Sequence, residues 1–147
     1  MNLKVGLVQF GQLSSVIPKL ASYLNKSEFW TNGRAWVDDI IAFLYTGRMQ
    51  LWVVYDPETH EMYGYTITEI KDYPRCKMLV VQYCAGEPNH MQYSQEEMFN
   101  TLEAAAKSVG CKGIEFFGRP GWGPHAKKHG YTTKTVVYEK HFDEVQP

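Results

Sequence analysis

Apolar residues recur with helical spacing soon after the start of the chain. A short apolar run over residues 3–8 predicts a first strand. The helical pattern that follows consists of Leu13, Val16, Ile17, Leu20 and Leu24. Pro18 lies inside this pattern, and proline is tolerated in the first turn of a helix but not in its interior. We therefore expect the helix to begin at Ser14 or Ser15, either of which is a suitable N-cap.

A second amphipathic stretch comes before the period of the apolar positions changes. Its apolar face carries Val37, Ile40, Ile41 and Leu44. Gly47 follows as a helix stop, because glycine readily adopts the left-handed conformation that ends many helices. After it the apolar residues alternate with a period of two, interrupted by turns that contain proline. The strands predicted from this alternation are residues 51–55, 62–70 and 77–84.

The second half of the chain returns to helical spacing and then shows further strand and turn signals. Met98, Leu102, Ala105 and Val109 form the apolar face of a helix over residues 94–109. The elements predicted after it are a strand at 112–117, a turn at 118–123, a short helix at 124–129 and a final strand at 131–140. A helix between two apolar strands requires a crossover connection. We therefore expect residues 77–84 and 112–117 to pair in parallel.

The composition is that of an ordinary globular protein, with 44% hydrophobic and 21% charged residues among 147. The 15 basic and 16 acidic residues almost cancel, which gives no general attraction for nucleic acid or for an anionic membrane. Three cysteines without a C-x-x-C pair, and no apolar run of membrane-spanning length, favour a reducing cytoplasm. Aromatic residues make up 14% of the chain, which suits a contact surface for protein partners.

The order of the predicted elements resembles that of the GNAT (N-acetyltransferase) superfamily over nearly the whole chain. The local match is strongest in the C-terminal half, where residues 128–131 read Lys-His-Gly-Tyr. Three stretches, residues 47–52, 72–75 and 118–122, are similar to a subgroup carried by bacteriophages. The resemblance implies a single GNAT-like domain over residues 1–147, of α/β (α+β) class. It also implies a mixed, mostly antiparallel central sheet with one parallel, splayed strand pair and helices on both faces.

The resemblance also indicates where an acyl-CoA cofactor would bind. In the family, pantetheine lies between the splayed strands, and pyrophosphate rests on a loop Gln/Arg-x-x-Gly-x-Gly/Ala at a helix N-terminus. If this chain binds the cofactor, the residues at those positions are Gln82, Tyr83, Cys84 and Gly86. The loop here has one glycine and no arginine, and it carries Glu87, which adds negative charge, and Pro88, which lacks an amide donor. Ser94 and Glu97 further predict a capping box that uses amides at the helix start.

No catalytic residue or metal site can be assigned from the sequence. Family enzymes often place a tyrosine on the short helix as general acid, and that slot falls on Ala126. Glu69 and Glu115 lie in predicted strands and are candidate general bases, although solvent-facing strand positions explain them equally well. His125 and His129 have the spacing of one helix face, but no third ligand is apparent, so we predict no metal site.

Two further features carry potential chemistry. Cys84 fits the role of a small residue at the end of a buried strand better than that of a reactive thiol. In the stiff turn of residues 118–124, Arg119 and Trp122 are of residue types that are common in interface hot spots. They form either a contact surface for a protein partner or a structural cap, in which Trp122 covers the sheet and Arg119 pairs with a carboxylate.

Two functional hypotheses follow. In the first, the chain is a phage-type GNAT-fold protein without a cofactor, a non-catalytic structural or interaction component of a virion or its assembly. Its partners would be phage structural proteins or other copies of itself, in the host cytoplasm or the assembled particle. In the alternative, the chain is an acetyl-CoA-dependent N-acetyltransferase with an atypical cofactor loop. The sequence favours the first hypothesis, because the phosphate loop and the general acid both depart from the family pattern.

Overall fold

The chain forms two compact units, Met1–Phe117 and Gly118–Pro147. A computed structural model describes residues 2–26, 34–87, 94–118 and 120–142. The first unit contains the β-sheet and the longer helices, and the second contains a short helix and an extended C-terminal segment. The expectation of a single domain over residues 1–147 stays a prediction.

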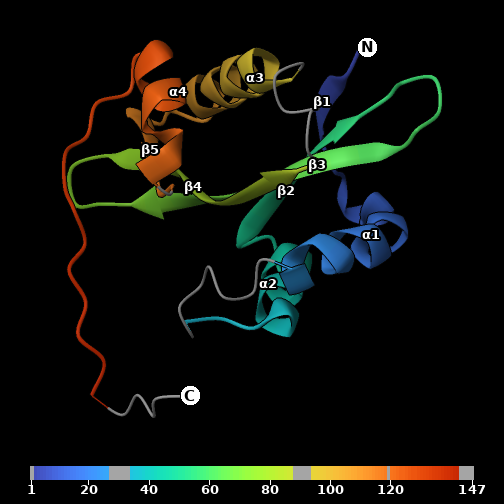
Figure 1. Ribbon diagram of the computed structural model, residues 1–147, viewed down its shortest axis with the longest axis horizontal. Helices are drawn as coiled ribbons and strands as arrows, with labels where there is room; N and C mark the ends of the chain where they lie inside the picture. Colours follow the sequence, from blue (N-terminus) through green and yellow to red (C-terminus); the bar gives the residue numbers. More distant parts are fainter. Residues whose placement is uncertain (1, 27–33, 88–93, 119, 143–147) are drawn as a thin grey trace. The chain divides into compact units, whose positions relative to one another are not determined.

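Within the described residues, a five-stranded sheet forms the centre of the first unit (Figure 1). Its strands are β1 (Lys4–Leu7), β2 (Met49–Tyr55), β3 (Met62–Asp72), β4 (Lys77–Gly86) and β5 (Gly113–Phe116). The strands lie in chain order, with antiparallel neighbours up to β4 and a parallel β4–β5 pair. This mixed sheet confirms the predicted fold class, and its parallel pair confirms the crossover expected from the helix between the two strands.

Helices cover both faces of the sheet, as predicted (Figure 1). The helices of the first unit are α1 (Leu13–Lys26), α2 (Val37–Tyr45) and α3 (Gln95–Ser108). α1 and α2 share a buried core with Leu51 of β2, whereas Leu102 of α3 packs in a second core with Trp52. Leu51 and Trp52 are consecutive, so alternate side chains of the same strand face the two cores. Burial on both faces explains why the central strands are rich in apolar residues.

The start of α1 differs from the prediction. The helix begins at Leu13, and Pro18 lies inside it rather than in its first turn. A 3-10 turn, η1 (Phe10–Gln12), leads into the helix, and Ser15 Oγ donates a hydrogen bond to Gln12 O (2.8 Å). Pro18 removes one backbone hydrogen bond from the helix. The earlier start nevertheless buries Leu13, which is only 4% exposed, and that burial favours the longer helix.

The described residues of the second unit form helical turns but no final strand. Its elements are η4 (Pro120–Trp122) and α4 (Gly123–Lys128), followed by an extended segment over residues 131–142. The predicted strand at residues 131–140 is wrong, because none of these residues has strand structure. Residues of high strand propensity form a strand only where the backbone also pairs with a neighbour. The apolar residues left largely exposed in this segment are Val136, Val137, Tyr138 and Phe142.

Candidate active site in the first unit

β4 has an irregular position at Gln82. In the antiparallel register with β3, Ile67 lies opposite Tyr83. The next residue of β3, Thr68, lies opposite Val81, so Gln82 is an extra residue and forms a β-bulge. On its other side, the parallel register of β4 with β5 ends at the same Val81. The bulge therefore coincides with the point where β4 leaves its parallel partner.

Residues 82–86 form the β4 extension, which is the part of β4 beyond its register with β5. Its backbone follows β3, and the pairing closes where Glu87 N donates to Tyr63 O (2.8 Å). Antiparallel strands alternate between hydrogen-bonded and non-hydrogen-bonded pairs. Glu87 forms a hydrogen-bonded pair with Tyr63. The peptide groups of Gly86, one residue earlier, and of Cys84, three residues earlier, therefore point away from β3. These groups face the side on which β5 accompanies the first half of β4.

The structure brings together the residues that the sequence predicted for cofactor binding. All of them lie at the bulge or in the β4 extension: Gln82, Tyr83, Cys84 and Gly86. The Tyr83 side chain packs against the core that α1 and α2 share. Cys84 is half-buried, which agrees with a small residue at the end of a strand. Their role in binding a cofactor stays a prediction.

Glu87 does not direct its carboxylate to the start of α3, contrary to the argument from the loop sequence. Its Oε1 accepts a hydrogen bond from Tyr23 Oη of α1 (2.7 Å), in the core on the other face of the sheet. Burial, reinforced by the Glu87 carboxylate, raises the pKa of the Tyr23 hydroxyl, so this phenol remains a donor. The predicted repulsion between Glu87 and a phosphate at the helix start is therefore wrong. Pro88, the other residue in that argument, lies outside the described residues.

Replacing Tyr23 by Phe removes the donor and leaves the Glu87 carboxylate without this partner. We expect the free energy of unfolding to fall by about 1–2 kcal/mol, measured by urea denaturation. Tyr45→Phe is the matched control, because Tyr45 is 39% exposed and its hydroxyl meets Ser14 Oγ at 3.3 Å near the surface. Equal losses in the two variants would mean that the Tyr23–Glu87 hydrogen bond makes no specific contribution.

The start of α3 also differs from the prediction. Ser94 adopts φ −129° and ψ −7° instead of the extended conformation of a typical N-cap, and its side chain makes no capping hydrogen bond. Glu97 Oε1 lies 3.4 Å from Val5 N of β1 and accepts its hydrogen bond. The predicted capping box of Ser94 and Glu97 is therefore wrong. The amides of the first turn of α3 are not occupied by such a box.

Two carboxylates lie on the sheet face that α1 and α2 cover. Glu69 of β3 and Glu115 of β5 both lie opposite Val80 of β4, so the three side chains belong to one row across the sheet. Tyr83 lies opposite Ile67, two residues before Glu69 in β3, and so it is on the same face beside the bulge. The register thus brings both candidate bases of the sequence to the bulge, on either side of one β4 residue.

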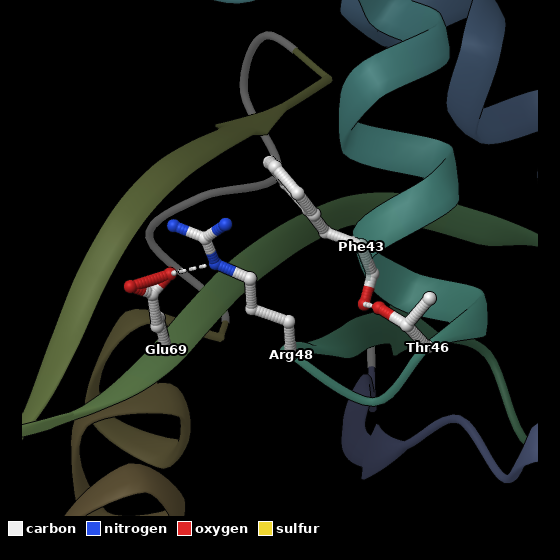
Figure 2. Close-up of polar contacts among 4 residues, drawn as sticks. All are labelled: Phe43, Thr46, Arg48 and Glu69. Atoms are coloured by element: carbon white, nitrogen blue, oxygen red, sulfur yellow. Dashed lines mark hydrogen bonds and ion pairs between the residues drawn. The ribbon is translucent and has the colours of Figure 1, made fainter.

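The two carboxylates have different partners. Arg48 Nε lies 3.4 Å from Glu69 Oε2, and the Glu69 side chain is 18% exposed (Figure 2). The guanidinium carbon of Arg48 also lies 4.2 Å from the centre of the Phe43 ring in α2. Glu115 Oε2 accepts a hydrogen bond from Tyr73 Oη (3.0 Å). Glu69 is therefore not a solvent-facing strand residue, because its side chain is largely covered and ion-paired.

Two tyrosines beside these carboxylates retain their protons. Burial, followed by the charge of Glu69, raises the pKa of Tyr83, while Arg34 acts in the opposite direction. The hydrogen bond to Glu115 is the main cause that raises the pKa of Tyr73. Both phenols therefore remain protonated at neutral pH. A carboxylate that accepts a proton and a phenol that donates one are the groups needed for general base and general acid catalysis.

Sequence reasoning did not identify Arg48 or Tyr73 as members of this site. Arg48 directly follows the predicted helix stop at Gly47, and Tyr73 lies in a predicted turn. An arginine placed at the start of a strand, straight after a helix stop, was the available signal. The register that joins these residues to Glu69 and Glu115 could not be derived from one sequence.

The remaining predicted residues lie in the second unit. Trp122 packs edge-on against His125, with the ring centres 5.9 Å apart. Arg119 lies outside the described residues, so the contact surface stays a prediction. In the part of the chain that the structure describes, no three His, Cys, Asp or Glu side chains are arranged to hold a metal ion. No described helix combines the length and the apolar character needed to cross a membrane.

Several solved acetyltransferase structures share this fold. One from Trypanosoma brucei is 13% identical, with a TM-score of 0.69, over 96% of this chain and 100% of its own. An aminoglycoside acetyltransferase from an uncultured soil metagenomic sample, in complex with sisomicin, has a TM-score of 0.73 at 9% identity, over 97% of both chains. A predicted acetyltransferase from Clostridium acetobutylicum, solved with acetyl-CoA, has a TM-score of 0.68 at 13% identity, over 95% of this chain and 96% of its own. No protein-family model matches the sequence, and no curated protein matches it either.

These likenesses give the chain the GNAT fold that its sequence resembles. They contradict the preferred hypothesis of a non-catalytic virion component, because several of the solved structures that share the fold over nearly the whole chain are acetyltransferases. They favour the alternative, an acetyltransferase. The expectation that no cofactor is needed gains no support either, since one of these structures contains acetyl-CoA. At identities this low the comparison itself shows the fold, and the function must be argued from the site.

Proposed function

We propose that this chain is an acetyl-CoA-dependent N-acetyltransferase. The observation that carries the proposal is the β4 extension: past the bulge at Gln82, β4 leaves its parallel partner while Gly86 turns its peptide group to that side. Glu69 and Tyr83 lie beside the same bulge. A strand edge suited to an extended ligand therefore ends next to a proton acceptor and a proton donor.

The residues of the β4 extension fit an acyl-CoA. Pantetheine is an extended chain with amide groups, and the peptide groups of a strand can pair with such a chain. Cys84 and Gly86 would hold the pantetheine arm, and the amides at the start of α3 would hold the pyrophosphate. Glu87 points to Tyr23 and therefore does not oppose the phosphate charge. When bound, the cofactor supplies an acetyl thioester that an amine can attack.

Glu69 and Tyr83 have complementary roles in the proposed reaction. An ammonium must lose a proton before its nitrogen can attack a thioester, and the Glu69 carboxylate would accept that proton. The Tyr83 hydroxyl keeps its proton because burial and the Glu69 charge raise its pKa. Tyr83 Oη would donate this proton to the departing thiolate and regain one from the attacking nitrogen, which must lose a second proton to become an amide. Such a donor in β4 would replace the tyrosine that is missing at Ala126.

We also propose that the chain is encoded by a bacteriophage and acts in the host cytoplasm. The resemblance of residues 47–52 and 72–75 to a phage-carried subgroup supports this source, and these stretches include Arg48 and Tyr73 of the candidate site. No disulfide joins the cysteines Cys76, Cys84 and Cys111, all of which lie in the described residues, and this suits a reducing compartment. The Trp122 turn would be a contact surface for a protein partner.

Calorimetry with acetyl-CoA tests the proposed function. We expect a dissociation constant in the micromolar range, and a gain in the free energy of unfolding of about 1.4 kcal/mol at about ten times that concentration. Acetyl-pantetheine and ADP, added separately, show whether the strand edge or the helix start provides the affinity. Release of CoA thiol on addition of mixed amines shows transfer. No heat and no thermal shift at millimolar acetyl-CoA would contradict the proposal.

A further inference from the structure

Arg48 is held in place on two sides (Figure 2). Its Nε lies 3.4 Å from Glu69 Oε2, and its guanidinium carbon lies 4.2 Å from the centre of the Phe43 ring. The end of α2 explains this position. Thr46 Oγ1 donates to Phe43 O (3.2 Å), and Gly47 follows with φ +79°. The left-handed residue reverses the chain, so that the Arg48 side chain folds back along the last turn of the helix.

The Nη groups of Arg48 are not used by the ion pair with Glu69. That pair uses Nε, and the guanidinium carbon lies over the Phe43 ring, while the two Nη groups point away from Glu69 (Figure 2). Among the described residues, none accepts a hydrogen bond from these Nη groups, and the side chain is 58% exposed. A guanidinium fixed in this way presents a pair of donors with the geometry that binds a carboxylate or a phosphate.

We propose that Arg48 and Glu69 together bind the acceptor, and that this acceptor is a small amine with an anionic group near its nitrogen. The proposal rests on the proposed function, because the amine is the group that would be acetylated. The Nη groups of Arg48 would hold the carboxylate or phosphate, and Glu69 would receive the amine. Since the two side chains touch, the two charged groups of the ligand must be separated by only a few bonds.

The surrounding charges agree with a ligand of both signs. Arg34 lies close enough to Tyr83 to oppose the effect of Glu69 on its hydroxyl. This face therefore carries three cations, Arg34, Arg48 and Lys71, and three glutamates, Glu69, Glu87 and Glu115. Two of the glutamates, Glu87 and Glu115, are bound to tyrosine hydroxyls. A site for a polycationic amine would require an excess of carboxylates. Balanced charges favour a zwitterion such as an amino acid or an aminoalkyl phosphate.

Binding of amines to the protein without acetyl-CoA tests this inference directly. Titration by saturation-transfer NMR compares matched pairs, glycine with glycinamide and aminoethyl phosphate with ethanolamine. We expect the anionic member of at least one pair to bind about tenfold more tightly, as a charge-assisted bidentate contact would give. The pair with the larger difference identifies the anion as carboxylate or phosphate. Equal binding within both pairs would overturn the inference.

Variants assign the preference to Arg48. Arg48→Gln should remove it, and Arg48→Lys, which keeps the charge but loses the planar fork, should keep part of it. Lys107→Gln is the matched control, because Lys107 is 74% exposed on α3, on the other face of the sheet, and its removal changes the net charge equally. A preference that survives in Arg48→Gln would overturn the inference, as would tighter binding of a polyamine than of either anionic amine.

Acetyl transfer distinguishes failure of this inference from failure of the proposed function. If both are right, Arg48→Gln raises KM about tenfold more for the anionic amine than for its neutral partner. If acetyl-CoA binds but neutral amines are acetylated as efficiently as anionic ones, the inference is wrong and the proposed function stands. If acetyl-CoA does not bind, the proposed function itself is wrong.

Discussion

Replacing Glu69 by Gln is expected to lower kcat for acetyl transfer about 10²–10⁴-fold, the usual contribution of a positioned general base. Glutamine keeps the shape of the side chain but cannot take a proton from the amine. The affinity for acetyl-CoA should remain unchanged, because Glu69 lies in β3 and not in the β4 extension. CoA release at saturating substrate gives kcat, and calorimetry on the same preparation gives the affinity.

Glu115→Gln is the matched control for this prediction. Glu115 lies opposite Val80 in the same row of the sheet, but its Oε2 is bound to Tyr73 Oη. We expect its replacement to change kcat little, because that hydrogen bond keeps the carboxylate away from the acceptor. A loss in Glu115→Gln as large as in Glu69→Gln would mean that the two carboxylates share the role. An active Glu69→Gln variant would remove Glu69 from the mechanism.

The strand and helix order could be predicted because the apolar period reports burial directly. The alternation around Leu51 and Trp52 reflects two cores, one on each face of β2. The helix between residues 77–84 and 112–117 required a crossover, and β4 and β5 are indeed parallel. The same reasoning failed at residues 131–140, where residues of high strand propensity are present but the backbone has no strand partner among the described residues.

The arguments against cofactor binding failed for a different reason. They depended on where particular side chains point, which residue type and spacing do not determine. Glu87 was expected to repel a phosphate, but its carboxylate binds Tyr23, which is 64 positions away in the sequence. Ser94 has the right residue type for a cap, but its backbone conformation keeps the hydroxyl from the first-turn amides. The Glu87–Tyr23 contact is tertiary, and a single sequence contains no signal for that contact or for the backbone conformation of Ser94.

The grouping of the candidate site depends on one extra residue in β4. Glu69, Tyr83 and Glu115 were all noted in the sequence, but as unrelated positions. A shift of one residue moves a side chain to the other face of a sheet. The bulge at Gln82 makes that shift, and it therefore puts Tyr83 on the same face as Glu69. Bulges of this kind have no reliable residue signature, so the site emerges only with the register.

Gly64 marks a close approach between β3 and the β4 extension. A Cβ atom at this position would lie 2.9 Å from Ala85 O and 3.1 Å from Gly86 Cα. Both are backbone atoms, so no rotation of a side chain can make room and the strands themselves must move. Gly64 is thus required for the spacing that sets the position of the Gly86 peptide group.

Gly64→Ala is therefore expected to lower the free energy of unfolding by about 1–3 kcal/mol and to weaken acetyl-CoA binding about tenfold or more. Gly113→Ala in β5 is the matched control, since its Cβ would meet Met78 Cε at 3.1 Å and Sδ at 3.7 Å. These atoms end a flexible side chain that can move aside, so stability and binding should change little. Urea denaturation measures the first effect and calorimetry on folded protein the second. If Gly64→Ala loses stability but binds acetyl-CoA as tightly as the unaltered chain, the β4 extension does not hold the cofactor.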